Sequence, residues 1–251
     1  MNRIRIGFLD SGIGGVTVLK ECMRILSNFE YVYYSDSINN PYGDKSVKEL
    51  NKIVDNIVIN LINKKCNIIV IACNTVSCMC VDYLRNKYRN IKFLAIEPAV
   101  KLAYDKNNGK NTLIMATKGT LDSEKFQKLY SKYNNDNFYL LSCVGLANLI
   151  EENEYELLDK YLVDNLSKYK NLVSSVVLGC THYPLIKDNI RKILGDVVFF
   201  DGAKGVANQL KRVIGEYDYK NNIDGKVLFF DSSCDIIKEQ RFFEILEGDY
   251  E

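Results

Sequence analysis

The sequence of 251 residues is poor in several features that mark particular classes of protein. It has no excess of charge of either sign, because 33 basic residues nearly balance 32 acidic residues. That balance argues against nucleic acid and membrane surfaces as partners. No apolar run approaches the ~20 residues of a membrane-spanning helix, and the first ten residues lack the apolar stretch of a secretion signal. We therefore expect a cytoplasmic protein.

Patterns that bind metals are equally scarce, since the chain has one histidine and none of its eight cysteines forms a Cys-x-x-Cys pair. Cys73, Cys78 and Cys80 could suggest zinc together with His182, but the ligand spacings of structural zinc sites are missing. We therefore predict no metal, and reduced thiols rather than disulfides. Three cysteines are assigned by default to packing: Cys22, Cys66 and Cys143.

Short apolar runs rich in β-branched residues alternate with longer amphipathic stretches along almost the whole chain. Strands are expected at residues 3–9, 31–35, 67–72, 91–95, 111–116, 137–142, 173–179, 197–200 and 226–230. Helices, with apolar residues spaced near 3.6, are expected at residues 14–27, 46–64, 76–89, 120–133, 155–170, 184–194, 203–217 and 235–247. This alternation predicts an α/β fold of mainly parallel sheets flanked by helices.

Both halves of the chain follow this rhythm, which predicts two similar α/β lobes with the active site in the cleft between them. The chain is expected to cross from one lobe to the other near Glu97 and Pro98, before a polar loop at 105–111. The first lobe should comprise residues 1–97 together with about 205–251, and the second lobe residues 98–204.

Two cysteines end two similar apolar runs, residues 67–75 and 176–182. In each run a segment of buried-strand type stops at a small residue, and then at Cys73 or Cys180. A thiol is thereby placed at the carboxyl end of a strand, where open α/β sheets bind their ligands. Free cysteine is also among the most buried residue types, but two matched cysteines favour a functional pair. Two proton carriers on opposite faces of one carbon are what inversion of a stereocentre requires.

A glycine-rich turn at residues 8–15 follows the first strand and opens the first helix. Its backbone N–H groups could bind an anion, but the spacing is not G-x-G-x-x-G and no P-loop lysine follows, which argues against a nucleotide. A tight turn without further role is the alternative. Asp10, at the end of this strand, could orient or deprotonate a thiol.

Two further features lie beside expected strand ends. Residues 40–43 carry a proline and a glycine at the positions typical of a β-turn, and they could offer backbone amides and the Tyr42 phenol to a small polar ligand. His182, the only histidine, lies two residues beyond Cys180. There it could polarise the thiol or donate to a carboxylate.

Taken in order, these motifs resemble the signature of bacterial glutamate racemases, within the aspartate/glutamate racemase family. The resemblance extends from residue 4 to about residue 200. Its most specific parts are Cys-Asn-Thr at 73–75 and Gly-Cys-Thr-His-Tyr-Pro at 179–184. It implies a cofactor-independent racemase of two α/β lobes that makes D-glutamate for peptidoglycan, and a homodimer is expected by the same analogy.

The resemblance also implies roles for individual residues. Cys73 and Cys180 are the two acid/base thiols, and Asp10, His182 and Glu151 assist them in catalysis. The substrate shell comprises Asp10, Ser11, Pro41, Tyr42, Gly43, Asn74, Thr75, Thr117, Thr181 and His182. One departure is that Cys-Val-Gly-Leu at 143–146 replaces the usual Cys-Pro-x-Phe.

The mechanism expected from the thiol pair needs no cofactor. One thiolate removes the Cα proton while the opposing thiol reprotonates the other face, and each serves as base in one direction only. A pyridoxal phosphate enzyme would use a lysine Schiff base, but no lysine lies at a comparable strand end. Two alternatives stay open, a non-catalytic amino-acid-binding protein of two lobes and an aspartate racemase with a shorter pocket.

Overall fold

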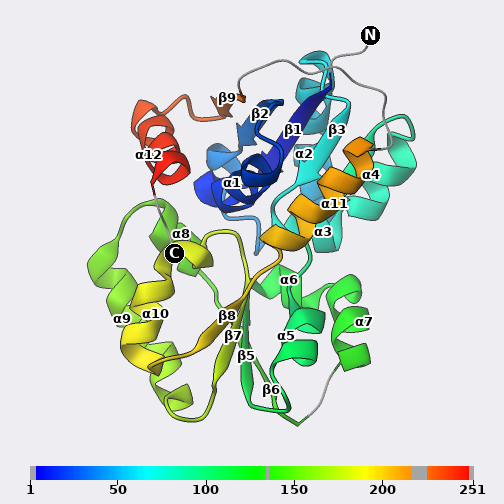
Figure 1. Cartoon of the computed structure of the whole chain (residues 1–251). Coiled ribbons are helices and arrows are strands. Elements are labelled where there is room, and N and C mark those ends of the chain that lie inside the picture. Colours follow the sequence, from blue (N-terminus) through cyan, green and yellow to red (C-terminus); the bar gives the residue numbers. More distant parts are fainter. Residues whose placement is uncertain (1–3, 134–135, 216–224, 249–251) are drawn as a thin grey trace.

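The computed structural model describes residues 4–133, 136–215 and 225–248, in which the apolar runs form two parallel sheets, one in each lobe (Figure 1). Every strand pair within these residues is parallel. Both faces of each sheet are covered by helices, which explains why most of the strand sequences are continuously apolar rather than alternating. The parts of the predicted first lobe at 1–3, 216–224 and 249–251 lie outside the described residues.

The first sheet has the strand order β4-β3-β1-β2-β9. Its strands are β1 (Arg5–Asp10), β2 (Glu30–Ser35), β3 (Ile68–Ile71), β4 (Lys92–Ala95) and β9 (Lys226–Asp231). One face is packed by α1 (Val16–Ile25), α11 (Ala203–Gly215) and α12 (Ile236–Glu247). The other face is packed by α2 (Val47–Asn63), α3 (Asn74–Met79) and α4 (Val81–Lys87). The C-terminal strand and helix therefore return to the lobe in which the chain begins.

The second sheet has the strand order β6-β5-β7-β8. Its strands are β5 (Thr112–Ala116), β6 (Phe138–Ser142), β7 (Ser175–Gly179) and β8 (Val198–Phe200). One face is packed by α8 (Leu146–Glu151), α9 (Tyr155–Leu166) and α10 (Lys187–Leu194). The other is packed by α5 (Val100–Lys106), α6 (Lys118–Asp122) and α7 (Glu124–Tyr133).

The register of the strands brings their carboxyl ends to one edge of each sheet. In the first sheet Leu9 pairs with Ile71, so Asp10 and Ala72 lie level at the ends of β1 and β3, and Cys73 follows one residue beyond. In the second sheet Ala116 pairs with both Ser142 and Gly179. The next residues along these three strands are Thr117, Cys143 and Cys180. The α/β fold with two parallel-sheet lobes is confirmed.

The predicted strands agree with the structure, with ends that differ by at most two residues over the part of the chain that is described. The helix predictions need correction. The single helix expected at 76–89 starts earlier, at Asn74, and breaks at Cys80, while that at 120–133 breaks at Ser123. Helices α5 and α8 are not predicted, since six or seven residues give too little periodicity to detect. The first two residues of the loop expected at 105–111 belong to α5.

Among the described residues, no helix is both long enough and apolar enough to cross a membrane.

Local capping interactions determine where helices begin. Helix α2, for example, begins at a capping box in which Ser46 accepts from the backbone of Glu49 and the Glu49 carboxylate accepts from the backbone of Ser46.

Candidate active site

A small cavity between the lobes is lined by both predicted thiols, Cys73 from the β3–α3 junction and Cys180 from the end of β7. Seven other predicted site residues line it as well: Ser11, Pro41, Tyr42, Gly43, Asn74, Thr75 and Thr117. Its volume is about 30 Å³, far below the roughly 300–1,000 Å³ of pockets that hold small molecules. The lobes are therefore closed on each other in this structure.

A larger groove of about 820 Å³ lies between α3, α6 and α7 and contains neither thiol. Its lysines and carboxylates are paired in part, as in the Lys125–Glu97 ion pair at 2.9 Å. We place the candidate active site in the smaller cavity because that is where side chains able to move a proton converge from both lobes.

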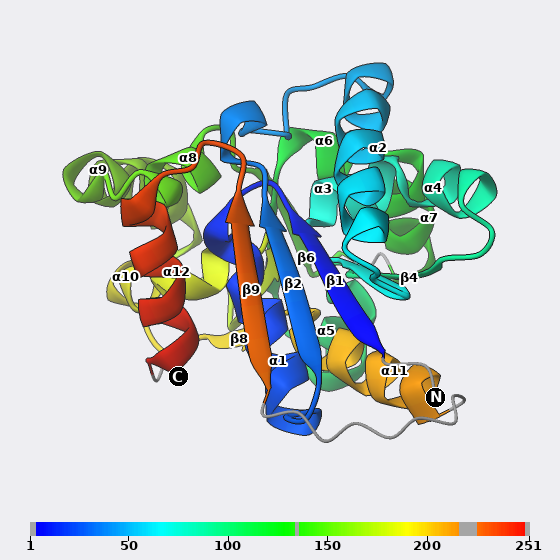
Figure 2. The ribbon, with the colours of Figure 1, turned by 90° about the horizontal axis from the view of Figure 1, so that it is seen from above.

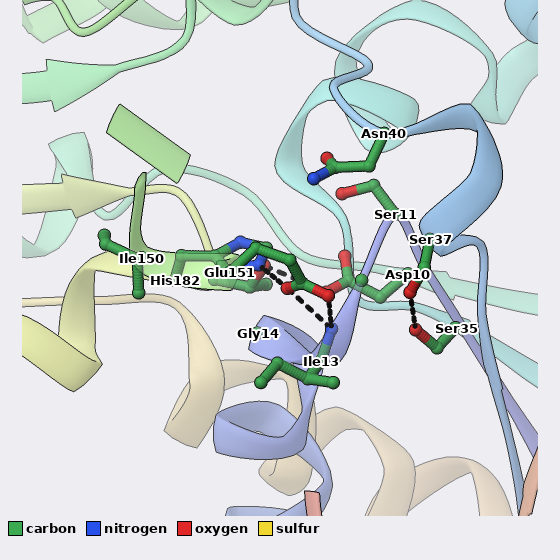
Figure 3. Close-up of polar contacts among 12 residues, drawn as sticks. Asp10, Ser11, Ile13, Gly14, Ser35, Ser37, Asn40, Ile150, Glu151 and His182 are labelled. Carbon is green, nitrogen blue, oxygen red and sulfur yellow. Dashed lines mark hydrogen bonds and ion pairs between the residues drawn. The ribbon is translucent and has the colours of Figure 1, made fainter. Parts of the chain in front are cut away.

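On the Cys180 side, three buried groups form a chain of contacts, of which Figure 3 shows the part made by Glu151 with His182 and the Ile13 backbone. Cys180 Sγ lies 3.7 Å from His182 Nδ1, and His182 Nε2 lies 2.6 Å from Glu151 Oε2. The backbone N–H of Ile13 donates to the same carboxylate at 3.1 Å. The side chains of His182 and Glu151 are 1% and 0% exposed, so their contact is shielded from water.

His182 and Glu151 each stabilise the charged form of the other. Burial alone would raise the pKa of Glu151, but the hydrogen bond from His182 and the His182 charge hold that pKa below its ordinary value. Burial alone would lower the pKa of His182, but its contacts with Cys180 and Glu151 hold it well above 6.5. An imidazolium at His182 is thus placed to stabilise a thiolate at Cys180.

The Cys73 side has a different environment. Burial, followed by the charge of Asp10, raises the pKa of the Cys73 thiol. Asp10 Oδ2 accepts from the Gly15 backbone at 2.6 Å and from the Thr181 hydroxyl at 3.1 Å. Burial raises the pKa of Asp10 to about 6. In the closed site Cys73 is therefore a thiol, while Cys180 faces an imidazolium.

The glycine-rich turn allows these groups to approach the first lobe. A Cβ atom on Gly12 would lie 2.5 Å from Glu151 Oε2, and one on Gly14 would lie 2.6 Å from His182 Nδ1. Such distances are shorter than carbon contacts tolerate, so the glycines leave room for the Glu151–His182 pair of the other lobe. The turn serves close packing between the lobes, and this is a physical reason for its glycines beyond a tight bend.

Hydrogen bonds across the lobe boundary close the opposite wall of the cavity. The Thr75 and Thr117 hydroxyl oxygens are 3.0 Å apart, and the Gly119 backbone donates to the Gly43 carbonyl at 3.0 Å. Tyr42 is fixed from behind, because its hydroxyl donates to Asp36 Oδ2 at 2.5 Å.

Four of the predicted site residues do not line the cavity but lie buried behind its wall: Asp10, Glu151, Thr181 and His182. Sequence reasoning misses several lining residues: Asn40, Asp44, Lys118, Val144, Gly145, Ala147 and Asn148. Cys143, which its sequence context assigns to packing, also lines the cavity. Its place directly after β6 is the signal that could identify it. Cys22 and Cys66, by contrast, lie in the cores on the two faces of the first sheet.

Comparisons with known proteins agree with this arrangement. A family model described as Asp/Glu/Hydantoin racemase matches residues 25–210. The curated glutamate racemase of Clostridium kluyveri is 44% identical over 234 residues, which are 90% of this chain and 91% of the relative. A glutamate racemase structure from Francisella tularensis in complex with D-glutamate has a TM-score of 0.81 and 27% identity, covering 98% of this chain and 94% of its own. That of Aquifex pyrophilus has a TM-score of 0.78 and 30% identity, with coverage of 99% and 97%.

Two α/β lobes with a thiol from each at one cavity define the class as that of two-lobed amino-acid racemases. The chain belongs to the Asp/Glu/Hydantoin racemase family. These three relatives are glutamate racemases, which confirms the resemblance predicted from the motifs.

Proposed function

We propose that this enzyme interconverts L- and D-glutamate by a two-base mechanism in which Cys73 and Cys180 are the acid and the base. The observation that carries the proposal is that two thiols, from corresponding strand ends of the two lobes, line one closed cavity. An amino-acid-binding protein needs the cleft and its polar turns, but it has no use for two thiols at matched strand ends.

The proton balance of the reaction is simple. The thiolate of one cysteine takes the Cα proton and becomes a thiol, while the thiol of the other cysteine gives its proton to the opposite face and becomes a thiolate. In the reverse direction the roles exchange. The raised pKa of Cys73 and the raised pKa of His182 beside Cys180 support a cycle in which Cys73 starts as the thiol.

Three buried polar atoms at the site have no hydrogen-bond partner among the described residues: Asp10 Oδ1, Asn74 Oδ1 and Asn74 Nδ2. Buried polar atoms are rarely left unpaired, and such exceptions require an explanation. The ammonium and carboxylate groups of an amino acid would supply the missing partners. The α-ammonium group would also offset the Asp10 charge, which otherwise opposes ionisation of Cys73.

Because the cavity of about 30 Å³ is far smaller than pockets that hold small molecules, we infer that the lobes separate to admit glutamate and close again for the proton transfers. Closure excludes water from the thiols, which strengthens every electrostatic interaction within the site. The D-glutamate formed would serve peptidoglycan synthesis in the cytoplasm. We expect no cofactor, and a homodimer as the functional unit.

The experiment is a polarimetric assay on L-glutamate and L-aspartate after exhaustive dialysis against a chelator and hydroxylamine. We expect turnover of glutamate without additions, and a loss of about 10²–10⁴-fold in Cys73→Ala and in Cys180→Ala. The matched control is Cys66→Ala, which removes a buried thiol far from the cavity and should stay near the parent rate. Restoration only by pyridoxal phosphate or zinc, or near-normal turnover in either active-site variant, contradicts the proposal. Faster turnover of L-aspartate than of L-glutamate would instead identify the enzyme as an aspartate racemase.

A further inference from the structure

The C-terminal helix α12 contacts both lobes and lies beside the Cys180 side of the site. It belongs to the first lobe by packing, because the buried Phe242 ring lies 4.6 Å from the Tyr33 ring and 4.4 Å from the Phe229 ring, centre to centre. An adjoining part of its surface contacts the end of α8 in the second lobe, beside which α12 lies in Figure 2. The last residue of α8 is Glu151, the carboxylate that holds His182.

Two cations of α12 contact this end of α8. Arg241 donates from Nη1 to the Glu151 carbonyl at 2.6 Å and from Nη2 to the Ile150 carbonyl at 2.8 Å. The last carbonyls of a helix lack partners within the helix, and a cation there is also favoured by the helix dipole. A helix of six residues has little stability of its own, so Arg241 fixes where Glu151 lies.

Lys238 acts on the side chain of the same residue. Its Nζ lies 3.9 Å from Glu151 Oε1 and 2.9 Å from Glu152 Oε1. The Lys238 side chain is only 14% exposed, so its charge is poorly screened by water. Since Lys238 and Arg241 are three residues apart on one helix, they face the same side. Arg241 binds the backbone of Glu151, and Lys238 places a second positive charge 3.9 Å from its carboxylate.

Apart from His182, the groups that hold the Glu151 carboxylate come from the first lobe, namely the Ile13 backbone and Lys238. The orientation of His182 therefore depends on the first lobe, although His182 and Cys180 both belong to the second. We propose that Lys238 and Arg241 are positioning residues of the racemase, which hold Glu151 against His182 and so prepare Cys180 for proton transfer. This inference rests on the proposed two-thiol function.

The test uses a reaction that needs only one of the two thiols. With D- and L-3-chloroglutamate, a thiolate takes the Cα proton and chloride leaves with the bonding electrons. The resulting enamine hydrolyses to 2-oxoglutarate and ammonia, and 2-oxoglutarate is measured. Cys180→Ala should abolish elimination from one Cα enantiomer, and Cys73→Ala from the other. These two variants identify which enantiomer reports on each side of the site.

Lys238→Met should slow elimination from the Cys180-dependent enantiomer by about tenfold, as expected when one charge-assisted interaction is removed. Elimination from the other enantiomer should change less than about twofold, because Cys73 does not depend on Glu151. Lys238→Arg, which keeps the charge, should restore the rate. Arg241→Met should likewise slow elimination from the Cys180-dependent enantiomer and leave elimination from the other nearly unchanged.

Two controls separate this effect from general damage. Lys160→Met removes an exposed ion pair of α9 with Asp164 and should change neither rate. Glu152→Gln removes the other partner of Lys238 and should also leave both rates within about twofold. Equal slowing of both enantiomers by Lys238→Met, or no slowing, overturns the positioning role. If Cys73→Ala and Cys180→Ala do not abolish elimination from opposite enantiomers, the proposed two-thiol function is wrong. That outcome is measured on the two cysteine variants alone, so it is distinguished from a failure of the positioning role.

Discussion

Asp10 should make the folded protein less stable at neutral pH than it would be with an uncharged residue. The carboxylate is fully buried, and one of its oxygens has no hydrogen-bond partner among the described residues. Burial raises its pKa from 3.8 to about 6. Asp10→Asn keeps an oxygen that can accept from Gly15 and Thr181 but carries no charge, so the variant isolates the cost of the ionised form.

The sign and the size of this effect on the free energy of unfolding follow from the difference in the Asp10 pKa between the folded and unfolded states. Between pH ~3.8 and ~6 the folded state keeps the Asp10 proton while the unfolded chain has lost it, so the stability of the parent falls as pH rises. The full shift corresponds to roughly 3 kcal/mol. About 1.4 kcal/mol of this develops between pH ~5 and ~7.5. Any cost of burying the new amide is the same at both pH values and does not affect this difference.

The assay is urea unfolding of the parent and of Asp10→Asn at these two pH values. The free energy of unfolding of the variant, relative to the parent, should increase by about 1.4 kcal/mol from the lower to the higher pH, while its racemase activity falls by about 10²-fold. Asp122→Asn, at an exposed carboxylate, is the control and should show no such change. A relative stability that does not depend on pH would refute the argument that burial governs Asp10.

Three other substitutions test separate parts of the account. Gly14→Ala places a methyl group where His182 lies and should lower kcat by at least ~10²-fold; activity within about twofold of the parent would contradict the close-packing role. Tyr42→Phe removes the hydrogen bond to Asp36 and should lower the free energy of unfolding by about 1 kcal/mol, measured in urea; an unchanged midpoint would contradict it. Phe242→Ala should cost about 3–5 kcal/mol by the same measurement, and a loss below ~1 kcal/mol would show that α12 is only loosely packed.

The sequence is most informative where a local pattern has a direct structural consequence. Continuous apolar runs predict buried parallel strands, and the residues after each run must then meet at one edge of a sheet. The sequence alone therefore places Cys73 and Cys180 each at the carboxyl edge of its own sheet, and the structure shows that both line one cavity. Breaks within helices at Cys80 and Ser123 cannot be predicted, because amphipathic spacing continues across them and tertiary packing decides where the backbone turns.

Interactions between distant segments are also invisible in the sequence. The glycines at 12–15 suggest an anion-binding turn or a tight bend, whereas the space beside Gly12 and Gly14 is taken by Glu151 and His182 from the other lobe. Nothing in the C-terminal helix pattern indicates that Lys238 and Arg241 reach α8, since charged residues on a helix are normally solvated. Such roles depend on how the lobes close, which no local periodicity encodes.

The most direct test of the two-thiol mechanism is racemisation of L-glutamate in deuterium oxide, followed by mass spectrometry of both enantiomers at low conversion. If one thiol removes the Cα proton and the other supplies a deuteron to the opposite face, the D-glutamate formed carries deuterium while the remaining L-glutamate does not. Deuterium in the recovered L-glutamate at the same rate would mean that a single base serves both faces, and it would contradict the central claim.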